Sequence, residues 1–222
     1  MHKNNSFCCA DCGTTIHESE KFRLRGPLSI MRHGRTGMND QHIIIGSIDD
    51  PLSELGREQS RSKAKELKTT EKRFDRIISS PYSRAFETAN IVAASMGTTV
   101  VTDKRLRERC VGIYEGKPEF PGLLELFLSD TPIENAESIE SLDGRIKSIL
   151  DDAEKYADIH SLFVTHALPL LKFMQYIKGW DLQEMLAYDL PKNCGVVKFR
   201  FCTPCLRCGS IFAEAVTASR AG

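Results

Sequence analysis

The chain has 222 residues, of which 41% are hydrophobic and 27% are charged, a composition typical of one globular domain with a substantial core and short extensions. Thirty basic residues balance thirty acidic ones, so no overall field favours nucleic acid or an anionic membrane surface. No apolar stretch is long enough to cross a bilayer, and residues 1–6 lack the apolar core of a signal peptide. We therefore expect a cytoplasmic protein that binds no nucleic acid and no membrane, whose oligomeric state the sequence leaves open.

The apolar pattern alternates between strands and helices. In chain order it predicts a strand at Leu28–Met31, a helix over 53–67, a strand at Arg76–Ser79, a helix over 83–96, a strand at Thr98–Thr102, a helix over 138–156, a strand at Leu162–Thr165, a helix over 168–177 and a strand at Val196–Phe201. Strands that alternate with helices indicate an α/β fold, a three-layer sandwich with a mainly parallel central sheet flanked by helices.

The first strand ends in Arg32-His33-Gly34-Arg35-Thr36, where open α/β sheets form their ligand crevices. The planar fork of a guanidinium pairs with phosphate oxygens, and an imidazole beside it is suited to attack or hold a phosphate. The alternative interpretation is a plain turn whose charges face water.

Two later strands also end in basic side chains. Pro81 starts the helix after 76–79, which puts Arg84 in a first turn where the helix dipole disfavours a cation. An anion between Arg84 and the helix N-terminus would remove that conflict, whereas the alternative is a surface arginine over the sheet edge. His166 directly follows the strand at 162–165, and its alternative is a buried core histidine.

The segment Leu106–Gly116 carries the acidic candidates. A carboxyl group near a dianionic phosphate keeps its proton more readily, as a general acid must, and Glu108 is placed for that role. Glu115 is the rival acid. The alternative is a solvated loop of mixed charge, which Arg107 and Arg109 favour.

Together these segments resemble the histidine phosphatase superfamily, also called the phosphoglycerate mutase-like family, over about residues 30 to 201. The resemblance rests on Arg-His-Gly-x-Thr at 32–36, Asn39, the stretch 46–56, Ser-Pro-x-x-Arg-Ala-x-x-Thr-Ala at 80–89, Leu-x-Glu-x-x-x-Gly-x-x-Glu-Gly at 106–116, Val-Thr-His at 164–166 and Asn-Cys-Gly at 193–195. The shared order of these motifs is far more specific than any one of them.

The resemblance implies a role for each matching residue in the reaction. His33 would be the nucleophile that takes the phosphoryl group and forms a phosphohistidine. The charge of the phosphate oxygens would be stabilised by Arg32, Arg84 and His166. Glu108 would protonate the leaving alkoxide and then activate water. Two guanidiniums take the place of a metal clamp, so we expect no cofactor for catalysis.

The resemblance also places Thr36 and Asn39 at the edge of the substrate pocket, although turn chemistry explains both equally well. The segment 117–136 is interpreted either as a substrate-selecting lid or as ordinary packing under a loop. Ala167 replaces the glycine usual in the family after the second histidine, which adds one methyl group near the pocket.

The implied activity is that of a phosphoric monoester hydrolase of the histidine acid phosphatase type, acting on a small-molecule phosphomonoester. Ile45 stands where glycolytic mutases carry a hydroxyl residue and Val111 where they carry tyrosine, so this chain lacks hydrogen-bonding groups that a mutase substrate would use. These departures favour the phosphatase branch. A phosphoglycerate mutase-type phosphotransferase and a catalytically weak phosphate-binding interaction protein are the alternatives.

On composition the chain divides into a cysteine-bearing leader at 1–26, the histidine phosphatase domain at 27–201 and a cysteine-bearing tail at 202–222. Each end holds one Cys-x-x-Cys-Gly, a spacing typical of half a zinc site. A structural zinc ion joining leader to tail would be held by Cys9, Cys12, Cys205 and Cys208. The alternative is a set of reduced thiols without partners, and Cys8 and Cys202 allow other pairings.

Overall fold

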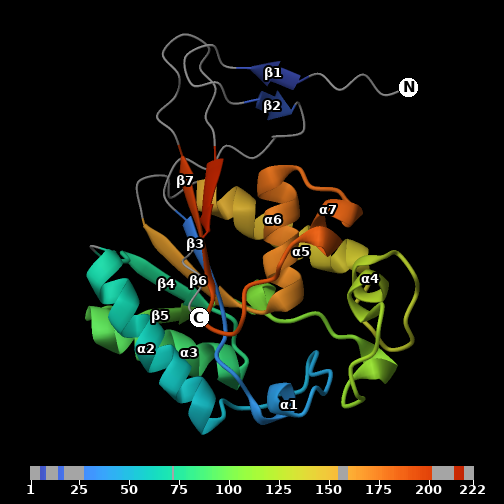
Figure 1. Cartoon of the computed structure of the whole chain (residues 1–222), viewed down its shortest axis with the longest axis horizontal. Helices are drawn as coiled ribbons and strands as arrows, with labels where there is room; N and C mark the ends of the chain where they lie inside the picture. The colour runs from blue at the N-terminus through green and yellow to red at the C-terminus, as the bar shows by residue number, and fades with distance from the viewer. Residues whose placement is uncertain are drawn as a thin grey trace.

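The computed structural model describes residues 6–8, 15–17, 28–71, 73–154, 160–201 and 213–217. A six-stranded sheet has the order β5-β4-β6-β3-β7-β8 (Figure 1). Its parallel part consists of β5 (Val100–Thr102), β4 (Arg76–Ser79), β6 (Ser161–Thr165) and β3 (Leu28–Arg32). Antiparallel strands β7 (Val196–Phe201) and β8 (Ala213–Thr217) complete it, and β1 (Ser6–Cys8) pairs with β2 (Thr15–His17) in a separate sheet. The predicted α/β sandwich with a mainly parallel sheet is confirmed.

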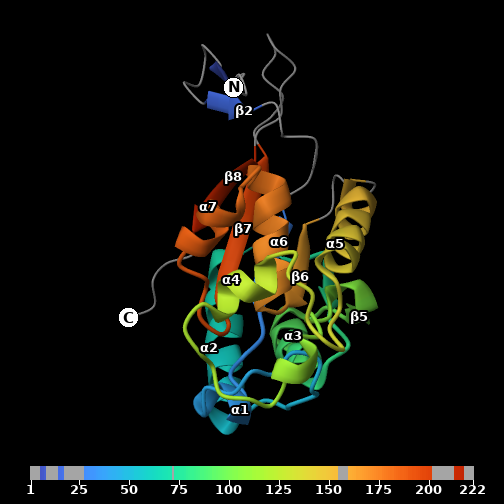
Figure 2. The same cartoon turned by 90° about the vertical axis from the view of Figure 1, so that its right-hand side faces the viewer.

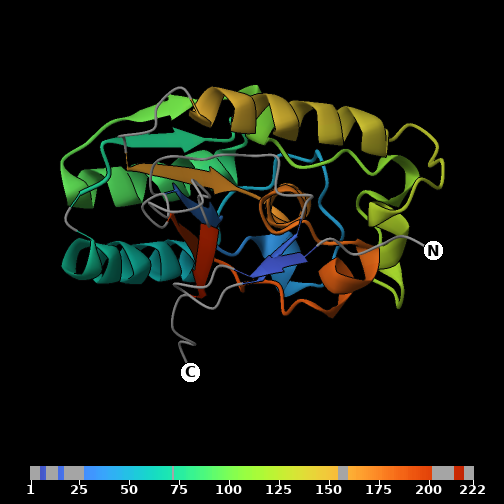
Figure 3. The same ribbon diagram turned by 90° about the horizontal axis from the view of Figure 1, so that it is seen from above.

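Helices cover both faces of the central sheet because its strands are apolar on both sides. α2 (Glu54–Thr70) and α3 (Ser83–Met96) pack with Met31, Ile77 and Val164 on one face. α5 (Ile139–Glu154) and α6 (Ala167–Lys178) pack with Ile30 and Phe163 on the other. Figure 3 shows the strands running between α2 on one side and α5 on the other, and Figure 2 shows α5 and α6 side by side.

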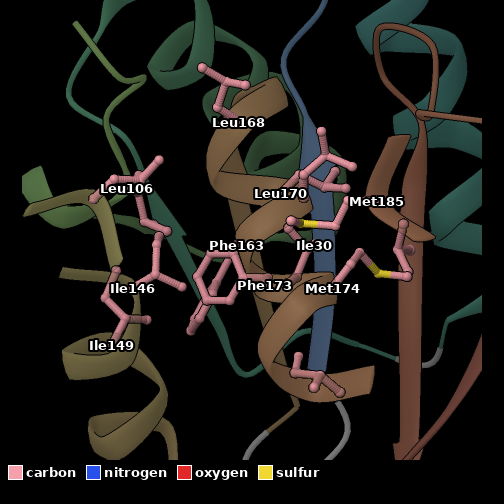
Figure 4. Packing of buried hydrophobic residues seen from close by; sticks show 14 of the residues in the cluster. Ile30, Leu106, Ile146, Ile149, Phe163, Leu168, Leu170, Phe173, Met174 and Met185 are labelled. Atoms are coloured by element: carbon pink, nitrogen blue, oxygen red, sulfur yellow. The ribbon is translucent and has the colours of Figure 1, made fainter. Parts of the chain in front are cut away.

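The larger core lies under α5 and α6 (Figure 4). Phe163 of β6 contacts Phe173 of α6 with ring centroids 5.9 Å apart, and Ile30 of β3 is fully buried beside them. Burying side chains of this size contributes about 1.5–3 kcal/mol each, so this cluster fixes α6 against β3 and β6. The ends of those two strands carry both predicted site histidines.

Five short helices complete the described fold: α1 (Gly37–Asp40), η1 (Lys104–Leu106), η2 (Gly112–Tyr114), α4 (Leu123–Leu128) and α7 (Leu182–Ala187). α4 lies in the segment interpreted as lid or packing. Phe127 of α4 is buried in the larger core and contacts Tyr114 at 5.8 Å between ring centroids, so this part of the segment packs under the loop.

The four cysteines of the predicted zinc site lie outside the described residues, as do Cys202 and most of the predicted leader and tail. The described strand β8 belongs to the segment 202–222 and pairs with β7. None of the described helices combines the length and the apolar character needed to cross a bilayer.

The turn after β3 packs directly against the first turn of α2. A methyl group on Gly56 would lie 2.0 Å from the Arg35 carbonyl oxygen, and one on Gly34 would lie 2.7 Å from the Gly56 carbonyl oxygen. Ser53 caps α2 by accepting a hydrogen bond from the Gly56 amide at 3.2 Å. This backbone-to-backbone contact fixes the turn that follows His33.

We expect Gly56→Ala to lower the free energy of unfolding by about 1–3 kcal/mol, because the added methyl overpacks a backbone contact that cannot relax cheaply. The matched control is Gly144→Ala within α5, where a methyl would meet nothing within 4 Å and should stabilise by up to about 1 kcal/mol. Urea unfolding midpoints measure the stability of both variants. Equal effects of the two substitutions would contradict the close backbone contact at Gly56.

Candidate active site

Three neighbouring parallel strands deliver the candidate residues to one edge of the sheet. Arg32 lies opposite Thr165 in the β3–β6 register, and the His33 amide donates to the Thr165 carbonyl at 3.0 Å. His33 and His166 therefore leave the sheet side by side, with ring centroids 5.0 Å apart. β4 adds Ser80, whose amide donates to the Val164 carbonyl at 2.9 Å.

His33 is buried, and one of its two ring nitrogens has a fixed partner. Nδ1 lies 2.7 Å from the Gly34 carbonyl oxygen, which only accepts hydrogen bonds, so Nδ1 carries the proton. Burial, together with the charges of Arg84 and Arg32, holds the pKa of His33 well below its usual value. The ring is therefore neutral, with a free electron pair on Nε2.

His166 is fully buried at the start of α6. Its Nε2 lies 2.8 Å from Ser80 Oγ, which itself accepts a hydrogen bond from the Tyr82 amide at 3.3 Å. With the Ser80 hydroxyl donating to Nε2, the ring proton of His166 lies on Nδ1. Burial and the Arg84 charge keep the pKa of His166 well below its usual value, so this imidazole is neutral too.

Arg84 is buried in the first turn of α3, where the sequence predicted a cation in conflict with the helix dipole. Its Nη1 donates to the Ile48 carbonyl at 2.7 Å and its Nη2 to the Gly46 carbonyl at 2.9 Å. Tyr82 lies under the guanidinium at 5.1 Å and contacts the His166 ring at 5.5 Å between centroids. Arg84 is thus held at the same edge as both histidines, so the alternative of a surface arginine is wrong.

Three buried nitrogens around His33 have no hydrogen-bond partner among the described residues: Arg32 Nε, Arg84 Nε and His166 Nδ1. An unpaired buried donor or acceptor costs about 1–3 kcal/mol, so proteins keep such groups mainly where a ligand satisfies them. Burial lowers the pKa of both arginines, yet a guanidinium stays charged in proteins. The cradle is therefore cationic and suits an oxyanion.

Glu108 is buried beside the cradle, at the N-terminus of α6. Its Oε1 accepts from the Arg109 amide at 2.8 Å and its Oε2 from the Ala167 amide at 3.1 Å. Burial raises the pKa of Glu108, against the opposing effect of hydrogen bonds from the Arg109 and Leu168 amides and of the Arg84 charge. Ala167, which replaces the glycine usual in the family, is the first residue of α6 and makes this contact with its backbone amide. Glu108 can therefore hold a proton next to the cradle.

The alternative interpretation of this segment, a solvated loop of mixed charge, is wrong. Arg109 is 2% exposed, and its guanidinium donates to the Glu137 carbonyl at 2.8 Å and to the Phe127 carbonyl. Arg107 pairs with the Glu137 carboxylate at 3.1 Å. The loop is thus fixed against α4 and the segment before α5, which gives Glu108 a rigid support.

The two pocket-edge candidates have local structural partners. Thr36 is buried and caps α1, since its Oγ1 accepts from the Asn39 amide at 3.2 Å. Asn39 Oδ1 accepts from Asn193 Nδ2 at 3.2 Å, and the same amide donates to the His33 carbonyl at 3.1 Å. Substrate contact by Thr36 or Asn39 stays a prediction.

Sequence reasoning gave no role to Ser80, Tyr82 or Asn193, which contact His166, Arg84 and His33 respectively. Ser80 and Asn193 belong to the motifs at 80–89 and 193–195, and this membership could have identified them as site residues. Val111 is part of the larger apolar core, and Ile45 is also buried. The replaced mutase positions thus face the interior.

The fold is an α/β sandwich, and its site places a neutral imidazole beside buried cationic nitrogens that have no hydrogen-bond partner among the described residues. A family model described as the histidine phosphatase superfamily (branch 1) matches residues 28–208. A protein of Hydrogenobacter thermophilus whose name places it among the phosphoserine phosphatases is 33% identical over 181 residues, which cover 77% of this chain and 87% of that protein. An Enterobacter protein named among the phosphoglycerate mutases is 30% identical over 182 residues, covering 78% of this chain and 83% of that protein.

Solved structures share the same fold. The mycobacterial glucosyl-3-phosphoglycerate phosphatase superposes with a TM-score of 0.74 at 22% identity, covering 87% of this chain and 98% of that chain. The phosphoserine phosphatase of Entamoeba histolytica superposes with a TM-score of 0.71 at 22% identity, covering 88% and 98%. The chain belongs to branch 1 of the histidine phosphatase superfamily.

The neutral state of His166 predicts a loss of stability in acid. Its pKa is lowered on folding, so below the ordinary value of 6.5 the unfolded chain binds the proton first. One such histidine costs about 1.4 kcal/mol of unfolding free energy between about pH 7.5 and pH 5.5. We expect His166→Gln to lose that much less than the unsubstituted protein over this range, measured by urea unfolding. Equal losses in the two proteins would refute the neutral state.

Proposed function

We propose that this protein hydrolyses small phosphomonoesters in two steps through a phosphohistidine on His33. The observation that carries the proposal is the set of three unpartnered buried nitrogens, Arg32 Nε, Arg84 Nε and His166 Nδ1, around a neutral imidazole. Membership of the histidine phosphatase superfamily supports it.

In the first step the electron pair on His33 Nε2 attacks phosphorus, and the bond from phosphorus to the ester oxygen breaks. The Nδ1–H of His33 stays on the Gly34 carbonyl, which orients the ring and stabilises the positive charge that it gains. The phosphoryl oxygens bond to the donors of the cradle, whose positions are set in advance by their backbone contacts. Glu108 gives its proton to the departing oxygen, and the alcohol leaves.

In the second step a water molecule attacks the phosphohistidine. Glu108, now a carboxylate, takes a proton from that water, the bond between nitrogen and phosphorus breaks, and its electron pair returns to Nε2 of His33. Inorganic phosphate leaves with the remaining atoms of the water. Glu108 is then protonated again and His33 neutral, as at the start.

The relatives indicate which substrates to test first. The Entamoeba phosphoserine phosphatase has been solved with phosphoserine, in a variant, and with 3-phosphoglyceric acid. Both ligands are small phosphomonoesters that carry a carboxylate. We therefore rank phosphoserine, 3-phosphoglycerate and glucosyl-3-phosphoglycerate first as substrates to test. The product formed from 3-phosphoglycerate distinguishes the two reactions, because hydrolysis gives glycerate and a mutase reaction gives 2-phosphoglycerate.

We expect the unsubstituted protein to hydrolyse p-nitrophenyl phosphate and His33→Ala to lose at least about 1000-fold in kcat. A chelator should not change the rate, since the cradle supplies its own cations. Rapid acid-free trapping with a ³²P-labelled substrate should label the unsubstituted protein and not the variant. A protein that binds phosphate but turns over none of these substrates would favour the phosphate-binding alternative.

The raised pKa of Glu108 and the lowered pKa of His33 predict a bell-shaped pH profile of kcat/KM. Activity falls in acid when His33 takes a proton below its lowered pKa, and falls in base when free Glu108 loses its proton above its raised pKa. Glu108→Gln should cost about 10²–10⁴-fold with phosphoserine, whose alkoxide needs a proton, and much less with p-nitrophenyl phosphate, whose phenolate does not. Equal losses with both substrates would remove Glu108 from the acid role.

A further inference from the structure

Arg84 depends on a backbone loop for its position. Both of its terminal nitrogens donate to carbonyls in the segment 46–48, which belongs to no helix or strand. A guanidinium held in this way is only as well placed as the two carbonyl groups that hold it. The fixation of the 46–48 segment therefore determines the geometry of the cradle.

Glu115 fixes that loop from its other side. Its Oε1 accepts from the Ser47 amide at 2.7 Å and from the Val111 amide at 3.0 Å, and its Oε2 accepts from Ser47 Oγ at 2.8 Å. Gly46 allows this approach, because a methyl group there would lie 2.3 Å from Glu115 Oε1, and its φ of +54° is one that glycine adopts freely.

The contacts of Glu115 and Arg84 meet on a single peptide group. The carbonyl of Gly46 and the amide of Ser47 belong to the same peptide, and in a trans peptide they point in opposite directions. Glu115 accepts from the amide, and Arg84 Nη2 donates to the carbonyl. Rotation of this peptide would break both contacts at once.

We propose that Glu115 is a positioning residue, which holds the Gly46–Ser47 peptide so that its carbonyl aims Arg84 into the cradle. This inference rests on the proposed function for its effect on hydrolysis, but not for its effect on phosphate binding. It also assigns the two acids of the segment 106–116 different tasks: Glu108 transfers the proton, and Glu115 acts through the backbone on a cation.

The test compares substitutions at Glu115 in two assays, the affinity for inorganic phosphate by calorimetry and the hydrolysis of p-nitrophenyl phosphate. Glu115→Gln retains an oxygen for the two amides and offers an N–H to Ser47 Oγ, so both readouts should stay within about threefold. Glu115→Ala frees the peptide, so phosphate affinity and kcat/KM should both fall by roughly 10–100-fold. Glu134→Ala, which removes an exposed carboxylate from the neighbouring loop, is the control and should change neither.

Should Glu115→Ala fail to fold, Glu115→Asp provides the same test, because its shorter carboxylate keeps the charge but cannot reach all three donors. Full phosphate affinity in the Ala or Asp variant would overturn the proposal. A Gln variant that binds phosphate normally but hydrolyses nothing would overturn it as well, and would make Glu115 the proton donor. If the unsubstituted protein shows no hydrolysis, the proposed function fails while phosphate affinity still decides the role of Glu115.

Discussion

Arg32 pairs with Thr165 across the parallel strands β3 and β6, so the next residue on each strand leaves the sheet at the same edge. This register places the His33 and His166 rings 5.0 Å apart before any loop is considered. A slip of one residue would turn every side chain of β3 to the opposite face and move His33 away from its partner. The buried clusters on both faces of β3 exclude such a slip, because Ile30 and Met31 belong to different cores. The packing of the sheet thus sets the geometry of the site.

The cradle concentrates positive charge in a place that water scarcely reaches. Arg84 is 1% exposed, and the hydrogen bonds that it makes go to neutral carbonyls rather than to a carboxylate. Leaving its Nε without a partner costs stability, and pairing that nitrogen with a carboxylate would cancel the charge that an oxyanion would meet here. The buried imidazoles show the same compromise, since they stay neutral where a cationic neighbourhood makes protonation unfavourable. These buried groups lower the stability of the folded protein and hold the charges of the site in fixed positions.

The sheet and the long helices could be predicted from the sequence because their apolar periodicity is strong. The helix over 138–156 is observed as Ile139–Glu154, and Ser138 caps it by accepting from the Ser141 amide at 3.1 Å. The strand expected at 98–102 begins only at Val100, because Gly97 ends α3 in a left-handed conformation with φ of +67°. α1, α4 and α7 are four to six residues long, too short for periodicity to reveal them.

The site residues that belong to sequence motifs could be predicted. The backbone groups that position them could not. Motif order identified His33, Arg84, Glu108 and His166, which the structure brings to one edge of the sheet. The carbonyls that hold Arg84 have no sequence signature, since every residue possesses one. The burial of Arg109 had no signal in the sequence, where its charge favoured only the alternative of a solvated loop, whereas carbonyl groups of α4 and of the segment before α5 accept from its guanidinium.

Glu108 serves two parts of the molecule with one carboxylate. Its Oε2 accepts from the Ala167 amide at the start of α6, so the carboxyl group that we propose as the proton donor also satisfies a free backbone amide of that helix. Anions are favoured at helix N-termini, and the neutral acid is a weaker acceptor there. A change of charge on Glu108 would therefore alter a hydrogen bond at the N-terminus of α6, the helix whose apolar face packs on β3 and β6.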